Sequence, residues 1–471
     1  MNILKSIGSF YKEPPIAEEI QDREKVDKMY PYWRLRIFYA CFIGYTIFYL
    51  CKKNIAVALP GIMDEFGYSA TELGLLGSSL YLTYGIGKFV NGVLADGANV
   101  RKFFPTALLM TATANILFAL APSAISIFGL GEKMTAMILL WTLAALWGVS
   151  GWFQSAGFPA VAKSLTYWYS NSERGTKWSL WSCSHQVGTF LSFIIAGHIA
   201  AHFGWRAAFL VPGTLAIITA LWLFERLRDR PQSMGLPDIE VYRNEPVKPK
   251  AEGSSDEDES YVQIFKKHVL CNKTLWLLAL AYVFVYIIRF GAEDWMIMYL
   301  KNAKNIDIAT ATNMIASLPL VGICGTVCAG IISDKLFKGK RAPVNLLYLT
   351  GVIISIIALK FNTIVNLNYV IIGLLGAFTY GPQMMIGGLC AVESSSKKVA
   401  SAASGFTGTF GYIGAFLSAT GTGFLVDKLG SNGVQNWDGA IYFWLASGVI
   451  CFILCTILMI DENKKRKATQ E

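Results

Sequence analysis

Long apolar segments alternate with short polar ones along almost the whole chain. Twelve of the apolar segments are long enough to cross about 30 Å of hydrocarbon as helices. They cover residues 35–60, 71–95, 103–123, 133–162, 179–202, 205–225, 272–300, 308–332, 343–361, 368–391, 402–426 and 438–460. The pattern therefore predicts an all-α membrane protein with twelve transmembrane helices.

One polar segment, which follows the sixth predicted helix, is much longer than the others. It contains the acidic run GSSDEDES, and a charged segment of this kind is typical of a flexible linker. We therefore expect two six-helix halves joined by this linker. The expected parts are an N-terminal segment (1–34), an N-terminal half (35–225), the linker (226–271), a C-terminal half (272–460) and a C-terminal tail (461–471).

Composition and charge agree with a membrane protein. Hydrophobic residues make up 54% of the chain and charged residues 15%, whereas soluble domains carry about 25% charged residues. Lys and Arg are concentrated in the linker and in the loops on the same side of the predicted helices, which predicts that this side and both termini are cytoplasmic. Basic loops also account for the net charge of +9, so we expect no nucleic-acid partner.

Two short patterns recur at nearly the same distance in the two halves. In each half the first helix carries two tyrosines and then a cation at the same spacing, namely Tyr45, Tyr49 and Lys52 and, 237 residues later, Tyr282, Tyr286 and Arg289. The loop GVLADGANVRK after the second helix parallels GIISDKLFKGKR after the eighth. The repeats predict an internal duplication. Two parallel halves around a central site characterise the major facilitator architecture.

Lys52 and Arg289 lie about equally far into their helices. A cation near the centre of a membrane helix costs roughly 2.5–3.5 kcal/mol to insert, so it usually faces a cavity and has a function. By pseudo-symmetry these two cations should face each other across a central cavity, where like charges repel unless an anion lies between them. We therefore expect an anionic ligand, and the planar fork of arginine suits phosphate or carboxylate.

Glu293 and Asp294 leave a second interpretation open. Glu293 lies four residues after Arg289, at the spacing of an intrahelical ion pair, and Asp294 lies one position further round. Such a pair would neutralise Arg289 without a ligand. The repeated tyrosines favour a binding role, because a structural ion pair does not require them. Lys53 lies about 100° around the helix from Lys52, so Lys52, on the tyrosine face, is the candidate.

Two further ionisable residues lie within the predicted helices. Lys88 follows Tyr84 by four residues, and it either lines the same cavity or serves as a counter-ion or a snorkelling residue. His185 lies in a stripe of small polar residues, WSCSHQVG. A lone membrane histidine is either a ligand or a hydrogen-bonded core group. The sequence leaves both alternatives open for both residues.

The chain contains none of the motifs of common enzymes. It has four histidines, no HExxH pattern and no GxxxxGK[ST] loop for phosphate. We therefore expect no enzymatic activity, no bound metal and no cofactor. Transport would then be driven by a gradient of the substrate, of a counter-ion or of protons, rather than by ATP.

Nine stretches of the sequence together match a known pattern: CKKNIAVALP, YGIGKFVNGVLAD, GWFQSAGFPA, WSCSHQVG, RLRDRPQSMGLP, VYIIRFGAEDW, SDKLFKGKR, YGPQMMIGG and GFTGTFGYIG. In these stretches the chain resembles the organophosphate:phosphate antiporter family of the major facilitator superfamily. In that family two arginines, on helices 1 and 7, hold the substrate phosphate. The resemblance implies substrate-binding roles for Lys52, Arg289, His185, Lys88, Tyr45, Tyr49, Tyr84, Tyr286, Tyr380 and Tyr412. Lysine replaces the family arginine at position 52, which keeps the charge and loses the fork.

The resemblance implies a secondary active transporter that exchanges a sugar phosphate for inorganic phosphate by alternating access. RLRDRPQSMGLP, SDKLFKGKR and GPQMMIGG resemble the hexose-phosphate branch more closely, so a hexose 6-phosphate such as glucose 6-phosphate is the expected substrate. A glycerol-3-phosphate:phosphate antiporter and a membrane sensor of external sugar phosphate are the alternatives. A bacterial inner membrane and a functional monomer are also implied, with the lipid bilayer and small molecules as the partners.

Overall fold

Helices make up nearly all of the regular structure in this computed structural model, which describes residues 9–129, 131–245, 266–337, 340–395, 400–431 and 434–470. Within those ranges, eleven helices are long and apolar enough to cross a membrane. The helix expected at 71–95 is also present, as α3 (Ala70–Asp96). The predicted all-α fold is confirmed.

The chain divides into two compact units. Unit 1 comprises Met1–Asn54, Thr83–Ser192 and Arg206–Ser254, and unit 2 comprises Ile55–Leu82, Phe193–Trp205 and Ser255–Glu471. Both units therefore include residues from the first half of the chain. The domain boundaries expected from the sequence stay a prediction, and the acidic run of the linker lies outside the described residues.

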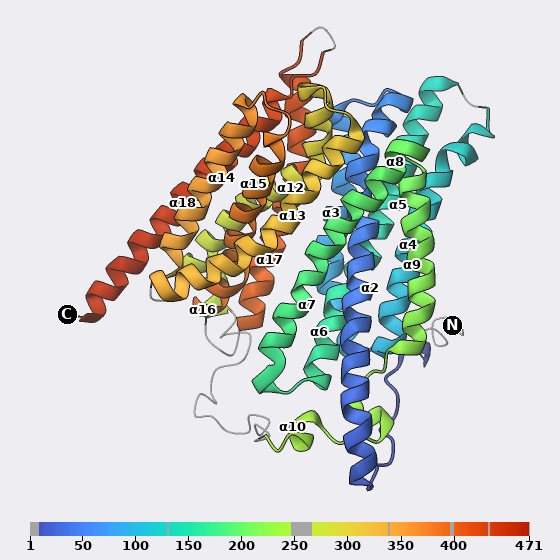
Figure 1. The fold of residues 1–471 in the computed structure, drawn as a ribbon, viewed down its shortest axis with the longest axis vertical. Helices are drawn as coiled ribbons and strands as arrows, with labels where there is room; N and C mark the ends of the chain where they lie inside the picture. The colour runs from blue at the N-terminus through green and yellow to red at the C-terminus, as the bar shows by residue number, and fades with distance from the viewer. Residues whose placement is uncertain are drawn as a thin grey trace. The chain divides into compact units, whose positions relative to one another are not determined.

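Unit 1 is built around α4, which packs against three neighbouring helices. The helices of this unit are most of α2 (Arg23–Phe66), the C-terminal part of α3, α4 (Val100–Ser126), α5 (Glu132–Gln154), α6 (Gly157–Trp168), α7 (Asn171–Leu191), α9 (Ala207–Arg226) and the short α10 (Ile239–Tyr242). α4 contacts α5, α6 and α9, and Figure 1 shows α4, α5 and α9 side by side. Large side chains such as Tyr30, Phe104 and Trp168 form the buried core of this unit.

The segment expected as one helix at 133–162 is broken between α5 and α6. Pro159 lies in the first turn of α6. Proline has no amide hydrogen, and in a continuous helix its ring would collide with the carbonyl of the residue four positions earlier, here Ser155. The helix is therefore interrupted only at Ser155 and Ala156, and α5 and α6 together still form one candidate membrane span from Glu132 to Trp168. The segment expected at 179–202 is also divided, into α7, a π-helical turn (Ser192–Ala196) and α8 (Gly197–Phe203).

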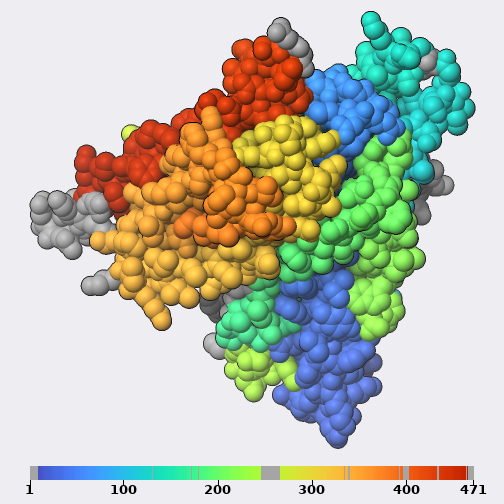
Figure 2. All heavy atoms as spheres, turned by 45° about the horizontal axis from the view of Figure 1, so that its top comes forward, coloured from blue at the N-terminus to red at the C-terminus, as the bar shows by residue number. Residues whose placement is uncertain are grey.

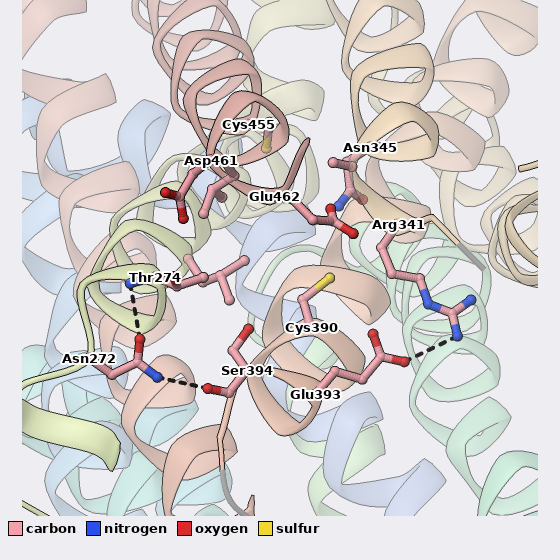
Figure 3. Close-up of a pocket in the computed structure, with 13 residues that line it drawn as sticks. Asn272, Thr274, Arg341, Asn345, Cys390, Glu393, Ser394, Cys455, Asp461 and Glu462 are labelled. Carbon is pink, nitrogen blue, oxygen red and sulfur yellow. Dashed lines mark hydrogen bonds and ion pairs between the residues drawn. The ribbon is translucent and has the colours of Figure 1, made fainter. Parts of the chain in front are cut away.

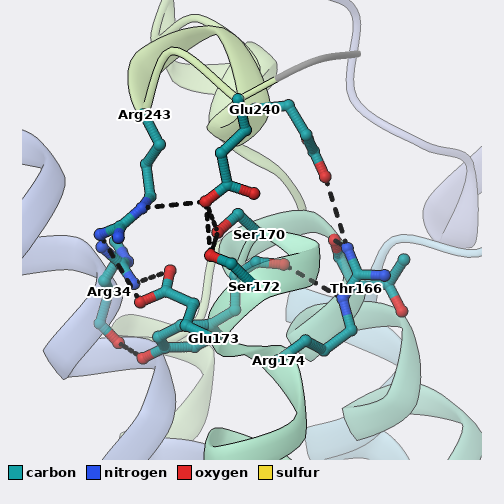
Figure 4. A network of polar contacts seen from close by, with 10 residues as sticks. Arg34, Thr166, Ser170, Ser172, Glu173, Arg174, Glu240 and Arg243 are labelled. Carbon is teal, nitrogen blue, oxygen red and sulfur yellow. Dashed lines mark hydrogen bonds and ion pairs between the residues drawn. The ribbon is translucent and has the colours of Figure 1, made fainter. Parts of the chain in front are cut away.

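A network of charges joins the N-terminal end of α7 to two other parts of unit 1 (Figure 4). Glu173 pairs with Arg34 of α2 and, at 3.7 Å, with Arg243, which follows α10. The hydroxyl of Ser172 donates to the carboxylate of Glu245 at 2.5 Å. This hydrogen bond is the main cause that holds the pKa of Glu245 below its usual value. The network fixes the described start of the polar linker against α2 and α7.

Unit 2 is built around α12, which is buried along almost its whole length from Ala281 to Leu300. Its helices are α12 (Lys273–Lys304), α13 (Ile308–Ile331), α14 (Arg341–Phe361), α15 (Leu367–Met384), the short α16 (Ala391–Glu393), α17 (Ala400–Lys428) and α18 (Asp438–Gln470), together with α8 and the adjoining ends of α2 and α3. α12 packs against α17 and α18, α13 against α15, and α14 against α15 and α18. Polar residues in the middle of α12 are therefore inside the protein.

The segments of α3 and α8 in unit 2 are held by close polar and steric contacts. The carboxylate of Asp427 on α17 accepts hydrogen bonds from the amides of Ala70 and Thr71, the first residues of α3, at 3.2 and 2.6 Å. Gly197 of α8 lies so near Thr312 of α13 that a Cβ would come within 1.9 Å of its side chain. In Figure 2 the yellow surface of α12 and α13 lies beside the orange surface of α14 and α15, which belong to the same unit.

We predict that Asp427→Ala lowers the stability of the purified protein in detergent by about 1–3 kcal/mol, because two helix-terminal amides lose a charged acceptor. The measurement is the midpoint of thermal unfolding. Asp427→Asn keeps one acceptor oxygen and should lose less. Asp307→Ala, which removes a cap at the start of α13, gives the scale for an ordinary helix cap. A wild-type midpoint for Asp427→Ala would contradict the prediction.

Candidate functional site

Lys52 lies in the middle of α2, and only 2% of its surface is exposed. Its Nζ is 4.0 Å from the ring centroid of Tyr84 on α3 and 5.3 Å from that of Tyr49 on α2. Aromatic faces attract cations, more strongly when water is excluded. The face shared by Lys52 and Tyr49, expected from helical spacing, is present, and Tyr84 completes it from a neighbouring helix.

Aromatic rings connect Lys52 to the other candidates in unit 1. Tyr45 lies 5.5 Å from Tyr49 and 4.8 Å from Trp181, and Tyr49 lies 5.5 Å from His185, measured between ring centroids. The structure therefore brings Tyr45, Tyr49 and His185 together. Sequence reasoning missed Trp181. It precedes His185 on α7 by four residues, so helical spacing could have indicated it.

Lys88 lies at the other end of the same aromatic row. Its Nζ is 5.4 Å from the ring centroid of Phe158, and that ring is 5.8 Å from Trp181. Phe158 is a second residue that sequence reasoning missed, although it lies within a stretch that carries the family resemblance. Lys88 is thus connected to the site through aromatic side chains.

Three buried polar atoms on the helices beside α2 have no hydrogen-bond partner among the described residues. They are Nε1 of Trp181, Oγ of Ser184 and Oε1 of Gln154. A buried polar atom without a partner costs about 1–3 kcal/mol. These atoms are therefore available to a polar ligand or to water.

Arg289 is the corresponding cation in unit 2, and 3% of its surface is exposed. Its Nε donates to Oε1 of Glu293 at 2.8 Å, and the hydroxyl of Tyr380 donates to the same oxygen at 2.6 Å. Its guanidinium carbon lies 5.0 Å from the ring centroids of both Tyr380 and Phe290. The intrahelical ion pair that the sequence left open as an alternative is therefore present.

The other tyrosines expected in this half lie along the same side of α12. The hydroxyl of Tyr282 donates to that of Tyr286 at 3.2 Å. The ring of Tyr286 is 5.8 Å from the guanidinium carbon of Arg289 and 5.9 Å from the ring of Tyr412 on α17. Tyr286 and Tyr380 thus lie beside Arg289, and Tyr412 packs against Tyr286 from a third helix.

Tyr81 is a member of the unit 2 cluster that the sequence did not indicate. Its hydroxyl donates to the carboxylate of Asp294, and its ring lies 4.7 Å from that of Phe290. Tyr81 comes from α3, so no pattern within α12 could have pointed to it. Asp294 and Glu293 each have a tyrosine hydroxyl as a partner.

The two clusters are rich in groups that bind anions. They contain a primary ammonium, a guanidinium, an indole N–H and several phenolic hydroxyls. Lys52 belongs to unit 1 and Arg289 to unit 2, so the expectation that they face each other stays a prediction. No group of three or more His, Cys, Asp or Glu side chains that could hold a metal occurs in the described part of the chain.

Comparison with known proteins gives several full-length matches. The family model described as Major Facilitator Superfamily matches residues 41–419. A "Probable hexose phosphate transport protein" of Chlamydia pneumoniae is 40% identical, covering 98% of this chain and 99% of its own. The "Glycerol-3-phosphate transporter" of Bacillus subtilis is 36% identical, over 98% of this chain and 99% of the relative. The "Membrane sensor protein UhpC" of Escherichia coli is 35% identical, over 95% of this chain and 98% of the relative.

Solved structures of the same fold also match. The crystal structure of a bacterial homolog to the human lysosomal transporter Spinster, in an inward-facing and unoccupied conformation, has a TM-score of 0.68 and 17% sequence identity. The match extends over 90% of this chain and 95% of the Spinster homolog. At this identity the likeness concerns the fold alone.

Proposed function

This chain belongs to the Major Facilitator Superfamily, and within it to the organophosphate:phosphate antiporters; from that premise we propose that it exchanges a hexose 6-phosphate for inorganic phosphate. The observation that carries the proposal is the pair of buried cations, Lys52 and Arg289, each on the first helix of its half and each beside tyrosine rings. The hexose phosphate named for the chlamydial relative supports a substrate such as glucose 6-phosphate. Two halves that rock around one central site would alternately expose it to either side.

In this proposal Lys52 and Arg289 are the two cations that bind the phosphoryl group. The guanidinium offers a planar fork of donors, and the ammonium offers a compact charge with rotatable donors. Tyrosine hydroxyls, a histidine ring N–H and a second ammonium complete the shell. The proposed contacts come from Tyr45, Tyr49, Tyr84, His185, Lys88, Tyr286, Tyr380 and Tyr412. Trp181, whose Nε1 has no partner among the described residues, is an additional donor.

Glu293 has a specific part in this proposal. Its carboxylate accepts from Nε of Arg289, so an arriving phosphate competes with it for the guanidinium. When phosphate takes the place of Glu293 at Arg289, the hydroxyl of Tyr380 still donates to Oε1, so the buried carboxylate keeps a hydrogen-bond donor. Glu293 thus competes with the substrate and, in the empty carrier, neutralises the cation.

The environment of the protein is the second part of the proposal. We place it in a bacterial inner membrane with both termini in the cytoplasm, which the concentration of Lys and Arg in the linker and its neighbouring loops supports. A single chain contains both cation clusters, which supports function as a monomer. Sensing of external sugar phosphate is a second candidate function, favoured by the 35% identity to the sensor UhpC.

The experiment that tests the proposed exchange uses proteoliposomes loaded with phosphate or with a non-phosphate buffer. Initial uptake of labelled glucose 6-phosphate should be much faster into the phosphate-loaded vesicles, because reorienting two buried cations without an anion is costly in low dielectric. The ion pair with Glu293 should leave a slow residual uptake. Equal uptake in both vesicles would indicate a uniporter or channel, and binding without uptake would indicate a sensor.

We predict that Lys52→Ala reduces the affinity for phosphate about 10- to 100-fold, since a charged hydrogen bond contributes about 1.5–3 kcal/mol. Lys52→Arg should exchange at least as well as the wild type, because it restores the arginine of the family. The measurement is the KM for phosphate in the same proteoliposomes. Normal exchange by the folded alanine variant would transfer the role to Lys53 or Lys88.

Glu293→Gln should lower the KM for phosphate roughly 5- to 30-fold, corresponding to about 1–2 kcal/mol, because the competing negative charge is removed. The same substitution should slow uptake into phosphate-free vesicles, since Arg289 then crosses without a counter-charge. The matched control is Glu225→Gln, which removes an ion pair with Arg36 away from the site. An unchanged KM together with unchanged residual uptake would show that Glu293 does not compete with the substrate.

A further inference from the structure

A cavity of about 420 Å³ lies within unit 2, away from Arg289 and its tyrosines (Figure 3). Its walls come from the start of α12, the start of α14, the segment around α16 and the C-terminal part of α18. The lining includes Asn272, Arg341, Asn345, Cys390 and the acidic residues Glu393, Asp461 and Glu462. A cavity of this volume is within the range that takes a small organic ligand.

Asn345 is the side chain in this cavity that lacks its normal partners. It is 3% exposed, and no group among the described residues donates a hydrogen bond to its Oδ1. In Figure 3 its amide points toward Glu462 across the cavity. A buried amide oxygen is normally hydrogen-bonded, so this position is suited to a ligand that brings a donor.

The rim of the cavity is held in place by polar contacts. Asn272 caps α12 by accepting from the amide of Thr274 at 3.1 Å, and its own amide donates to the carbonyl of Ser394 at 2.7 Å. Arg341 pairs with Glu393 at 3.2 Å. The opening is therefore formed by groups whose positions are fixed before any ligand arrives.

The charge of the lining indicates the sign of the ligand. Among the lining residues that the structure describes, Glu393, Asp461 and Glu462 carry carboxylates and Arg341 carries a guanidinium, which pairs with Glu393. An excess of acceptors favours a cation that carries hydrogen-bond donors. Groups of three or more side chains that could hold a metal ion are absent from the described residues, so an organic cation fits better than a metal.

We propose that this cavity binds a primary ammonium group, which donates to Oδ1 of Asn345 and to the facing carboxylates. A primary ammonium has three N–H donors, whereas a quaternary ammonium has none. Four candidate membrane spans begin or end at the cavity, at Lys273, Arg341, Cys390 and Glu462. At that depth the ammonium can come from a free amine in the water or from an aminolipid headgroup.

The experiment uses the full chain in nanodiscs and measures the alkylation of Cys390 by N-ethylmaleimide. Cys390 lines the cavity and is partly exposed, and the exposed Cys271 is the internal reference for reagent. Peptide mass spectrometry gives both rates in phosphatidylcholine discs, in the same discs with putrescine, and in discs that contain phosphatidylethanolamine. An ammonium in the cavity should slow alkylation of Cys390 at least five-fold relative to Cys271.

Two variants and a control make the test specific. Asn345→Leu removes the unpartnered acceptor, and Glu462→Gln removes a facing charge while keeping the shape; each should abolish the protection. Ser355→Ala, a buried change further along α14, should keep it. Protection by putrescine identifies a free-amine site, and protection by phosphatidylethanolamine alone identifies an aminolipid site. Absence of protection in both, or equal protection in Asn345→Leu, would overturn the proposal in favour of a water-filled cavity.

Discussion

Two buried cations impose the main physical constraint on this protein. A charge removed from water destabilises the fold strongly unless opposite charges, hydrogen-bond partners or aromatic faces surround it. Arg289 is surrounded by Glu293, Tyr380 and Phe290 on or beside the most deeply buried helix of unit 2. The packing of α12 against α17 and α18 excludes water from this group, and the chemistry of the site depends on that exclusion.

The two halves solve this constraint differently, although their tyrosine and cation positions repeat. Counting back by the repeat distance from Glu293 and Asp294 leads to Ala56 and Val57, so the first half has no carboxylate there. Lys52 lies instead beside the ring faces of Tyr84 and Tyr49. A carboxylate competes with phosphate for its cation, whereas an aromatic face leaves the N–H donors of an ammonium able to turn toward a ligand. The two halves therefore carry a cation at the same position and differ in the groups that surround it.

The sequence predicts the helices well because apolar length and helical period act locally. It also predicts two groups, Tyr45 and Tyr49 with Lys52 on one helix and Tyr286 with Arg289 on another, since residues on one helix face lie together. Phe158 and Tyr81 were missed because they reach the clusters from other helices, and only tertiary packing determines which of many aromatic residues do so. Trp181 shares a helix with His185, so its spacing was the one available signal. For a similar reason, the sequence left open whether Arg289 forms an ion pair with Glu293 or binds a ligand. It depends on side-chain rotamers, which spacing alone does not fix.

The π-helical turn from Ser192 to Ala196 falls where unit 1 ends and a segment of unit 2 begins. The hydroxyl of Ser192 donates to the carbonyl of Leu50 on α2 at 3.1 Å, so the first residue of the turn is anchored. A π turn contains one more residue than the turns around it. The extra residue can be taken up by the α-helix that follows the turn. Every side chain beyond it then rotates by about 100° around the helix axis, and the helix keeps nearly all of its backbone hydrogen bonds. His198, whose Nε2 lies 3.0 Å from Oδ1 of Asn313, is in the part that would rotate, so the orientation of that histidine reports the register of the helix.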